Sequence, residues 1–137
     1  MPLDLTMRVL VVEDNRTMGK IVRNLLALVG FKHIDNVFDG NSALRLLREN
    51  EYGLVVSDWN MQPMTGHALL KEIRADPTLK SVPVLVVTAE SQVGTIVAAK
   101  EDGASGYIVK PFTGEMLRQK IAAIFASGTA TNVIFTQ

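Results

Sequence analysis

Residues 53–60, Gly-Leu-Val-Val-Ser-Asp-Trp-Asn, point to the fold because an uninterrupted apolar run ends abruptly on a carboxylate. A Leu-Val-Val run without alternation is typical of a strand that is covered on both faces of a parallel sheet. Asp58 then lies where the strand leaves the sheet, and in open α/β sheets ligands bind just beyond the carboxyl ends of the strands. The stretch therefore predicts a buried strand with a functional acid at its end, although an Asp in this place can also serve only as a turn or cap residue.

A second strand of the same kind is predicted over residues 8–12, and it ends in the adjacent carboxylates Glu13 and Asp14. If the two strands are neighbours, their ends lie about 5 Å apart. Three carboxylates this close repel one another unless a cation lies between them or some of them take up protons. Oxygen ligands of this hardness suit Mg²⁺, with Mn²⁺ as an alternative, and a chain without Cys does not favour zinc. Capping of the next helix by Asp14 or Asn15 is a second use of these side chains and is compatible with metal binding.

The composition of the 137 residues is that of one globular domain, with 47% hydrophobic residues. Lys plus Arg and Asp plus Glu both number 14, so no net field directs the chain toward nucleic acid or an anionic membrane. No apolar run approaches the roughly 20 residues of a membrane span, and residues 1–6 lack the features of a secretory signal. We therefore expect a cytoplasmic protein that binds no nucleic acid directly and does not insert into a membrane.

Strand and helix patterns alternate about five times along the chain, which implies a doubly wound parallel sheet with helices on both faces. Further strands are expected at residues 33–38, 82–87 and 107–109, and helices at 16–29, 43–50, 66–76 and 113–125. A weaker helix is expected over residues 91–102, because Gly94 inside it costs about 1 kcal/mol relative to Ala. This helix is the element expected to move.

The end of the chain is expected to add no second domain. Residues 1–126 are predicted to form the domain, and residues 127–137 a flexible tail rather than a docking segment. A built-in DNA-binding or enzymatic output is therefore not expected, and the output is expected to be the binding of another protein.

Four predicted strands end on polar groups that together suit phosphoryl transfer. Thr88 follows the strand over 82–87 and Lys110 follows the strand over 107–109, in addition to the three acids. A carboxylate can attack phosphorus, acids can hold a divalent cation, and a hydroxyl and an ammonium can bind phosphoryl oxygens. A single Lys is usually a surface charge and a single Thr a cap, so the prediction depends on their joint position at successive strand ends.

With the motifs around them, these residues resemble the receiver domains of two-component response regulators, most closely the single-domain chemotaxis regulators. The resemblance runs from about residue 8 to residue 125. The motifs that carry it are Asp58-Trp59-Asn60-Met61, Thr88-Ala89-Glu90, Gly103-Ala104-Ser105-Gly106-Tyr107 and Lys110-Pro111-Phe112. The resemblance implies a flavodoxin-like fold with five strands in the order 2-1-3-4-5.

The resemblance also implies a role for each residue of the acidic site. Asp58 is expected to accept a phosphoryl group from a histidine kinase or phosphotransfer protein, or from a small donor such as acetyl phosphate. Asp14, Asp58 and the backbone carbonyl of Asn60 are expected to bind Mg²⁺, with Glu13 acting through water. Lys110 is expected to pair with the acyl phosphate and to precede a cis peptide bond. The protein would catalyse only its own phosphorylation and dephosphorylation, so it is expected to be a signalling receiver and not an enzyme.

The family further implies a switch that connects the site to a distant surface. Phosphorylation is expected to draw Thr88 toward the phosphoryl group and to swing the ring of Tyr107 inward. This would remodel the surface formed by the weak helix, the last strand and the last helix, which would bind a target such as the flagellar motor switch. Without the resemblance, Tyr107 would be interpreted as an aromatic residue on a sheet edge. Asn60 and Glu90 match positions that influence the loss of phosphate.

Two departures from the family pattern lie close to the acidic residues. Pro63 comes one residue later than the usual proline, so the loop after Asp58 is expected to run differently. Asn15 stands where the chemotaxis regulators have an aromatic residue, which opens one side of the acidic pocket. A phosphorelay intermediate and a receiver outside chemotaxis remain alternatives.

Two other classes of protein fit the sequence less well. An aspartyl-phosphate phosphohydrolase also uses an Asp at a strand end with Mg²⁺, but it typically carries a second Asp two residues later, where this chain has Asn60. A flavin carrier of the same topology needs a phosphate-binding loop after the first strand, where Glu13 and Asp14 would repel a phosphate.

Overall fold

The computed structural model describes residues 3–89 and 93–127 of the chain. Strands and helices alternate along these residues, as the apolar pattern predicted. The elements are β1 (Arg8–Val12), α1 (Arg16–Val29), β2 (His33–Val37), α2 (Gly40–Glu49), β3 (Leu54–Asp58), α3 (Gly66–Ala75), β4 (Val84–Thr88), α4 (Val93–Glu101), β5 (Gly106–Val109) and α5 (Gly114–Ser127). Glu90 and residues 128–137 of the expected tail lie outside the described residues.

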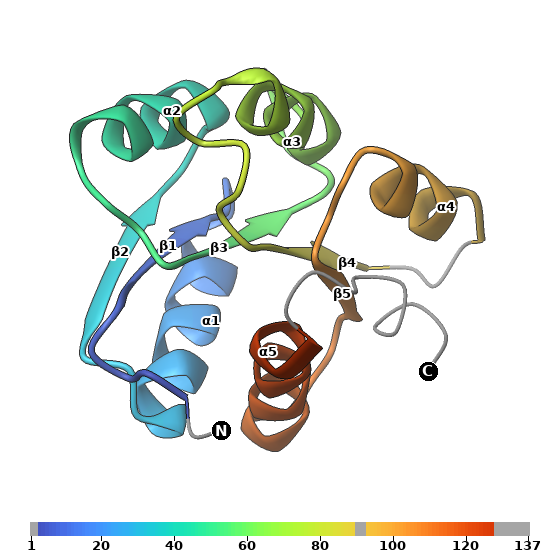
Figure 1. Cartoon of the computed structure of the whole chain (residues 1–137). Helices are drawn as coiled ribbons and strands as arrows, with labels where there is room; N and C mark the ends of the chain where they lie inside the picture. Colours follow the sequence, from blue (N-terminus) through green and yellow to red (C-terminus); the bar gives the residue numbers. More distant parts are fainter. Residues whose placement is uncertain (1–2, 90–92, 128–137) are drawn as a thin grey trace.

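The five strands form one parallel sheet in the order β2-β1-β3-β4-β5, which confirms the expected flavodoxin-like topology (Figure 1). Neighbouring strands are paired with their ends nearly level: Val12 lies opposite Ser57, Asp58 opposite Val87, and Thr88 opposite Val109. The residues that end or follow β1, β3, β4 and β5 therefore meet along one side of the sheet, which we call the carboxyl edge.

Helices cover both faces of the sheet, α1 and α5 on one face and α2, α3 and α4 on the other (Figure 1). On the α1 and α5 face, Val11 and Val56 of the sheet belong to one buried cluster with Leu26 of α1 and Ile121 of α5. Every residue of β3 and β4 is buried, as expected for strands covered on both faces. Two-sided burial leaves only the edges of the sheet open to ligands.

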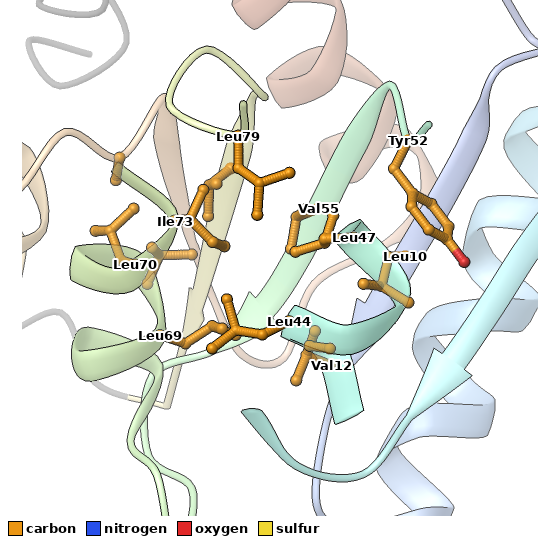
Figure 2. Close-up of a cluster of buried hydrophobic side chains, with 14 of the residues drawn as sticks. Leu10, Val12, Leu44, Leu47, Tyr52, Val55, Leu69, Leu70, Ile73 and Leu79 are labelled. Carbon is orange, nitrogen blue, oxygen red and sulfur yellow. The ribbon is translucent and has the colours of Figure 1, made fainter. Parts of the chain in front are cut away.

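Figure 2 shows the core on the opposite face, where Leu10 and Val55 of the sheet belong to one cluster with the leucines of α2 and α3. Leu69 and Ile73 of α3 are fully buried in this cluster. Removing each such side chain from water contributes roughly 2 kcal/mol to folding. This packing holds α3 firmly in place against β3.

Several elements begin or end a few residues from the expected positions, and the start of β4 has a clear physical reason. β4 begins at Val84 and not at residue 82, because Pro83 has no N–H to donate and only its carbonyl takes part in the ladder, accepting from the Val55 N–H at 2.9 Å. In α4, Ala99 is the only buried residue among residues 94–101. α4 is thus the weakly packed helix that the sequence predicted. Across the part of the chain that the structure describes, no helix combines the length and apolar character needed to cross a bilayer.

Candidate functional site

Three carboxylates meet at the carboxyl edge. Glu13 and Asp14 follow β1 and Asp58 ends β3, and one oxygen of each lies within 4.8 Å of the others. Glu13 and Asp58 are buried, whereas Asp14 is exposed. Backbone hydrogen bonds fix the strand ends, because the Glu13 N–H donates to the Val37 carbonyl and the Trp59 N–H donates to the Val87 carbonyl, at 3.1 and 2.8 Å. The acids are thus brought together by the sheet itself.

Lys110 supplies the positive charge of the site. Its Nζ lies 3.0 Å from Glu13 Oε1 and 3.3 Å from Asp58 Oδ1. The Lys110 N–H donates to the Thr88 carbonyl at 2.7 Å, and the Lys110–Pro111 peptide is cis, as the resemblance implied. Within the described chain, Lys110 is the one cationic side chain that lies within 4.0 Å of these carboxylates. One ammonium therefore pairs with two of the three clustered carboxylates, Glu13 and Asp58.

Burial and pairing act in opposite directions on the two buried partners. Burial raises the pKa of Glu13, and the hydrogen bonds from Lys110 and from the Asn15 N–H offset this rise only in part. For Lys110, burial lowers the pKa, but its hydrogen bond to Glu13 and the charges of Asp58 and Glu13 outweigh burial, so the pKa lies above its ordinary value. The ammonium is held protonated by its surroundings.

The capping role that the sequence left open falls to Asn15. Its Oδ1 accepts from the Met18 N–H at 2.9 Å and so caps α1. The Asn15 N–H donates to Glu13 Oε2 at 3.2 Å. The carboxylate of Asp14 is therefore not used as the cap and stays with the acidic cluster.

The loop after Asp58 depends on Gly66, a residue whose importance the sequence reasoning missed. The Gly66 N–H donates to the Trp59 carbonyl at 2.9 Å. A Cβ at Gly66 would lie 1.9 Å from the Asp58 carbonyl oxygen and 2.7 Å from Trp59 Cα, so no other residue fits without moving backbone. The loop also contains a cis Gln62–Pro63 peptide, and it is here that the pattern departs from the family. A glycine at the start of a helix just after an acidic strand end was the available signal.

The remaining predicted residues lie around this cluster. Thr88 is buried at the end of β4, next to the backbone of Lys110. Tyr107 is partly buried on β5, and Lys120 Nζ lies 4.6 Å from the centre of its ring. The side chain of Asn60 is exposed just beyond Trp59. Glu90 lies outside the described residues.

The acidic cluster is chemically suited to a hard divalent cation. Its donors are all carboxylate oxygens, and they come from two adjacent strands that the sheet holds in register. Mg²⁺ prefers such ligands and commonly binds through one or two carboxylates. The buried positions of Glu13 and Asp58 limit the solvent that can screen their repulsion.

Comparison with known proteins defines the class: the chain belongs to the response regulator receiver domain family, whose sequence profile matches residues 9–122. It is 46% identical over 123 residues to chemotaxis protein CheY-3 of Vibrio cholerae, covering 90% of this chain and 95% of that protein. It is 45% identical over 119 residues to chemotaxis protein CheY of Pseudomonas aeruginosa, covering 87% and 96%. The chain is thus a receiver domain homologous to the single-domain chemotaxis regulators.

Solved structures agree with this assignment. Chemotaxis response regulator CheY4 of Vibrio cholerae superposes with a TM-score of 0.80 at 29% identity, covering 87% of this chain and 98% of that one. The receiver domain of a sensor histidine kinase from Pseudomonas aeruginosa PAO1 also gives a TM-score of 0.80, at 25% identity and with 88% and 98% covered. That structure has a magnesium ion coordinated in its active-site cleft.

Proposed function

We propose that this protein is a stand-alone response regulator that is phosphorylated on Asp58. The observation that carries the proposal is the cluster of Glu13, Asp14 and Asp58, with the Nζ of Lys110 at 3.0 Å from Glu13 and 3.3 Å from Asp58. An Asp58 oxygen attacks the phosphorus of a phosphohistidine on a histidine kinase or phosphotransfer protein. The new P–O bond forms as the P–N bond breaks, and the imidazole leaves with a proton.

In this proposal Glu13, Asp14, Asp58 and the backbone carbonyl of Asn60 hold Mg²⁺, or Mn²⁺ in its place. The bound ion supplies positive charge against the carboxylates and the incoming phosphoryl oxygens. The all-oxygen donor set supports this choice of ion, as does the magnesium in the related receiver structure. Lys110 adds a positive charge that pairs with both Glu13 and Asp58. After phosphorylation its ammonium can pair with a phosphoryl oxygen while it keeps its contact with Glu13.

The output of the switch is the binding of a target protein to the surface of α4, β5 and α5. Thr88 approaches the phosphoryl group, and the ring of Tyr107 changes position in response, so that this surface alters. The names of the chemotaxis relatives support chemotaxis as the pathway. The family resemblance suggests a flagellar motor switch as the kind of target. Asn60 and Glu90 modulate the loss of phosphate. The protein acts in the cytoplasm and catalyses only its own phosphorylation and dephosphorylation. Residues 1–126 form the receiver domain, and residues 127–137 form a tail.

The proposal is tested by phosphorylation with acetyl phosphate and Mg²⁺, followed by intact mass. The wild type should gain one phosphoryl group that hydroxylamine removes, and Asp58→Asn should gain none. Asp35→Asn, a matched change at the opposite side of the sheet, should be phosphorylated like the wild type. Labelling of Asp58→Asn at the wild-type level would refute the site. Lys110→Ala should still bind Mg²⁺ but respond weakly to phosphorylation.

A further inference from the structure

The ring of His67 lies against the one tryptophan of the chain. Trp59 and His67 stack with ring centroids 4.6 Å apart and planes inclined by 20°. Trp59 directly follows Asp58, and His67 is the second residue of α3. The Gly66 N–H joins the two segments by its hydrogen bond to the Trp59 carbonyl at 2.9 Å. The position of the imidazole is therefore tied to the peptide that follows Asp58.

The same imidazole also reaches α4. His67 Nε2 pairs with Asp102 Oδ2, and both side chains are about two-thirds buried. Asp102 directly follows α4, and its N–H donates to the Ala98 carbonyl at 3.0 Å. Among the residues that the structure describes, Asp102 is the only carboxylate within 4.0 Å of a nitrogen of this ring. His67 thus bridges the loop of Asp58 and the C-terminal end of α4.

Few other contacts compete with this bridge. Ala99 is the only buried residue among residues 94–101, and Val97 is 44% exposed. The turn after α4 is held to α3 by a second side chain, because Arg74 Nε donates to the Gly103 carbonyl at 2.8 Å. A helix with so little buried surface is positioned largely by its polar attachments. Of the two attachments to α3, only the one made by His67 also contacts Trp59, the residue that follows Asp58.

We propose that His67 is a positioning residue that couples the Asp58 loop to α4, and that protonation of its ring sets the strength of this coupling. The inference rests on the proposed phosphorylation of Asp58. An imidazolium forms an ion pair with Asp102 and presents a cation to the face of Trp59. A neutral ring keeps only one hydrogen bond to the carboxylate. The α3–α4 contact is therefore tighter at low pH, and rearrangement of α4 on phosphorylation is harder there.

Other charged residues belong to the three segments that meet at the His67 ring, which are α3, the end of α4 and the end of β3. Lys71 lies one turn further along α3, and Glu101 precedes Asp102 at the end of α4. Both side chains are exposed, so solvent screens them. Asp58, on the far side of the Trp59 peptide, is paired with Lys110. Asp102 is thus the partner whose charge the ring senses most directly.

The first test needs neither metal nor phosphate. Because the chain has one tryptophan, its emission reports on the surroundings of Trp59, and His67→Gln isolates the part that comes from the stack. Emission should change when the pH is lowered across the range in which an imidazole gains its charge. The change should be absent in His67→Gln, altered in Asp102→Asn and unchanged in His33→Gln. A flat emission, or the same transition in His67→Gln, would overturn the proposal.

The second test measures coupling to phosphorylation. The acetyl phosphate concentration that half-saturates the mass increase, with Mg²⁺ present, is measured at two pH values on either side of the transition. For each protein, the concentration at the lower pH is divided by the concentration at the higher pH. Dividing the wild-type ratio by the ratio of His67→Gln removes the pH dependence of the donor, and the result should be about 3 to 10. A normalised ratio of one would overturn the coupling and leave the proposed function standing. No mass increase in the wild type at either pH would refute the proposed function and the coupling, whereas the emission transition would stand.

Discussion

Charged side chains gather at both edges of the sheet, but they are balanced at one edge only. At the edge where the strands begin, the amino edge, Arg8 donates to Asp35 at 2.9 Å and to Asn50 at 3.1 Å, and the Tyr52 hydroxyl donates to Asp35 at 2.6 Å. At the carboxyl edge, three carboxylates lie together and the ammonium of Lys110 pairs with only two of them. A satisfied network stabilises the fold, whereas crowded like charges reduce stability and leave affinity for a cation.

Arg74 extends the satisfied network along the amino edge. It leaves α3 and donates to the carbonyls of Gly103, Val82 and Lys80 at 2.8, 2.6 and 3.1 Å. These carbonyls precede β4 and β5, so one guanidinium holds the beginnings of two strands. Burial lowers the pKa of Arg74, although the group remains charged. The charge of Arg74 is therefore engaged within the fold.

The largest effect is expected from Gly66→Ala at the carboxyl edge. The added Cβ would displace the backbone of Asp58 and Trp59. We expect a loss of about 3 kcal/mol in unfolding free energy, measured by urea denaturation, together with loss of phosphorylation. Gly94→Ala is the control, because no atom lies within 4 Å of its added Cβ, and it should stabilise α4 by up to about 1 kcal/mol. Wild-type stability and phosphorylation in Gly66→Ala would contradict the close approach.

Arg74→Met should have the next largest effect and should separate stability from function. Loss of the guanidinium leaves the carbonyls of Gly103 and Val82, which are partly buried, without this donor, and we expect a cost of about 2 kcal/mol in unfolding free energy. Phosphorylation by acetyl phosphate should persist in the folded fraction, because the acids lie at the opposite edge. The exposed Arg45→Met on α2 serves as the matched control, with a change within about 0.5 kcal/mol. A loss of phosphorylation in folded Arg74→Met would show that the amino edge contributes to phosphorylation and not only to stability.

Replacing an Asp by Asn should raise the thermal midpoint at the carboxyl edge and lower it at the amino edge. Without divalent cations, Asp14→Asn should raise the thermal midpoint by a few degrees, since it removes repulsion, and Asp35→Asn should lower it by a similar amount. Mg²⁺ should raise the midpoint of the wild type and of Asp35→Asn, and raise that of Asp14→Asn less. Differential scanning calorimetry with chelator and with Mg²⁺ measures both effects. Midpoints that move in the same direction would show that the edges do not differ in charge balance.

The smallest effect concerns Tyr52 at high pH. Burial and the hydrogen bond to Asp35 raise the pKa of Tyr52 to about 12. Because the folded pKa lies above the unfolded value of about 10, the stabilisation is complete below that value and is lost as the pH rises through about 12. Ultraviolet titration of tyrosinate in Tyr107→Phe, which leaves one tyrosine, should show this midpoint.

Two variants sharpen the Tyr52 measurement. Asp35→Asn in the same background should lower the tyrosine midpoint, and Tyr52→Phe should cost about 1 kcal/mol of stability at neutral pH. At low pH the hydrogen bond from Tyr52, followed by the pairing with Arg8, lowers the pKa of Asp35, so this contribution is lost only as the pH falls through the lowered value. A tyrosine midpoint near 10 would count against the network.

Local patterns were enough to place the strands and the acids of the carboxyl edge. Unbroken apolar runs specify strands buried on both faces, and the side chain that ends each run must lie at the sheet edge. The order of the strands came from the family resemblance and not from the residues. The start of β4 was placed too early because the apolar run includes Val82, whereas Pro83 delays the ladder to Val84.

The amino edge was not predictable, since its contacts join residues that are far apart in the chain. Arg8 meets Asp35 only because β1 and β2 pair with Leu10 opposite Asp35. Arg74 and His67 depend in the same way on how α3 lies beside the turn that follows α4. Hydrophobic periodicity fixes which face of a helix is buried but not which distant polar groups its ends will meet.

The uneven burial of the helices has a consequence for backbone amide exchange. Amides of β3 and β4, which are buried throughout, should exchange with solvent deuterium only through global unfolding. Amides of α4, with Ala99 alone buried among residues 94–101, should exchange through local opening that leaves the sheet intact. This helix, which belongs to the proposed target-binding surface, would then sample its open form many times in each lifetime of the folded core.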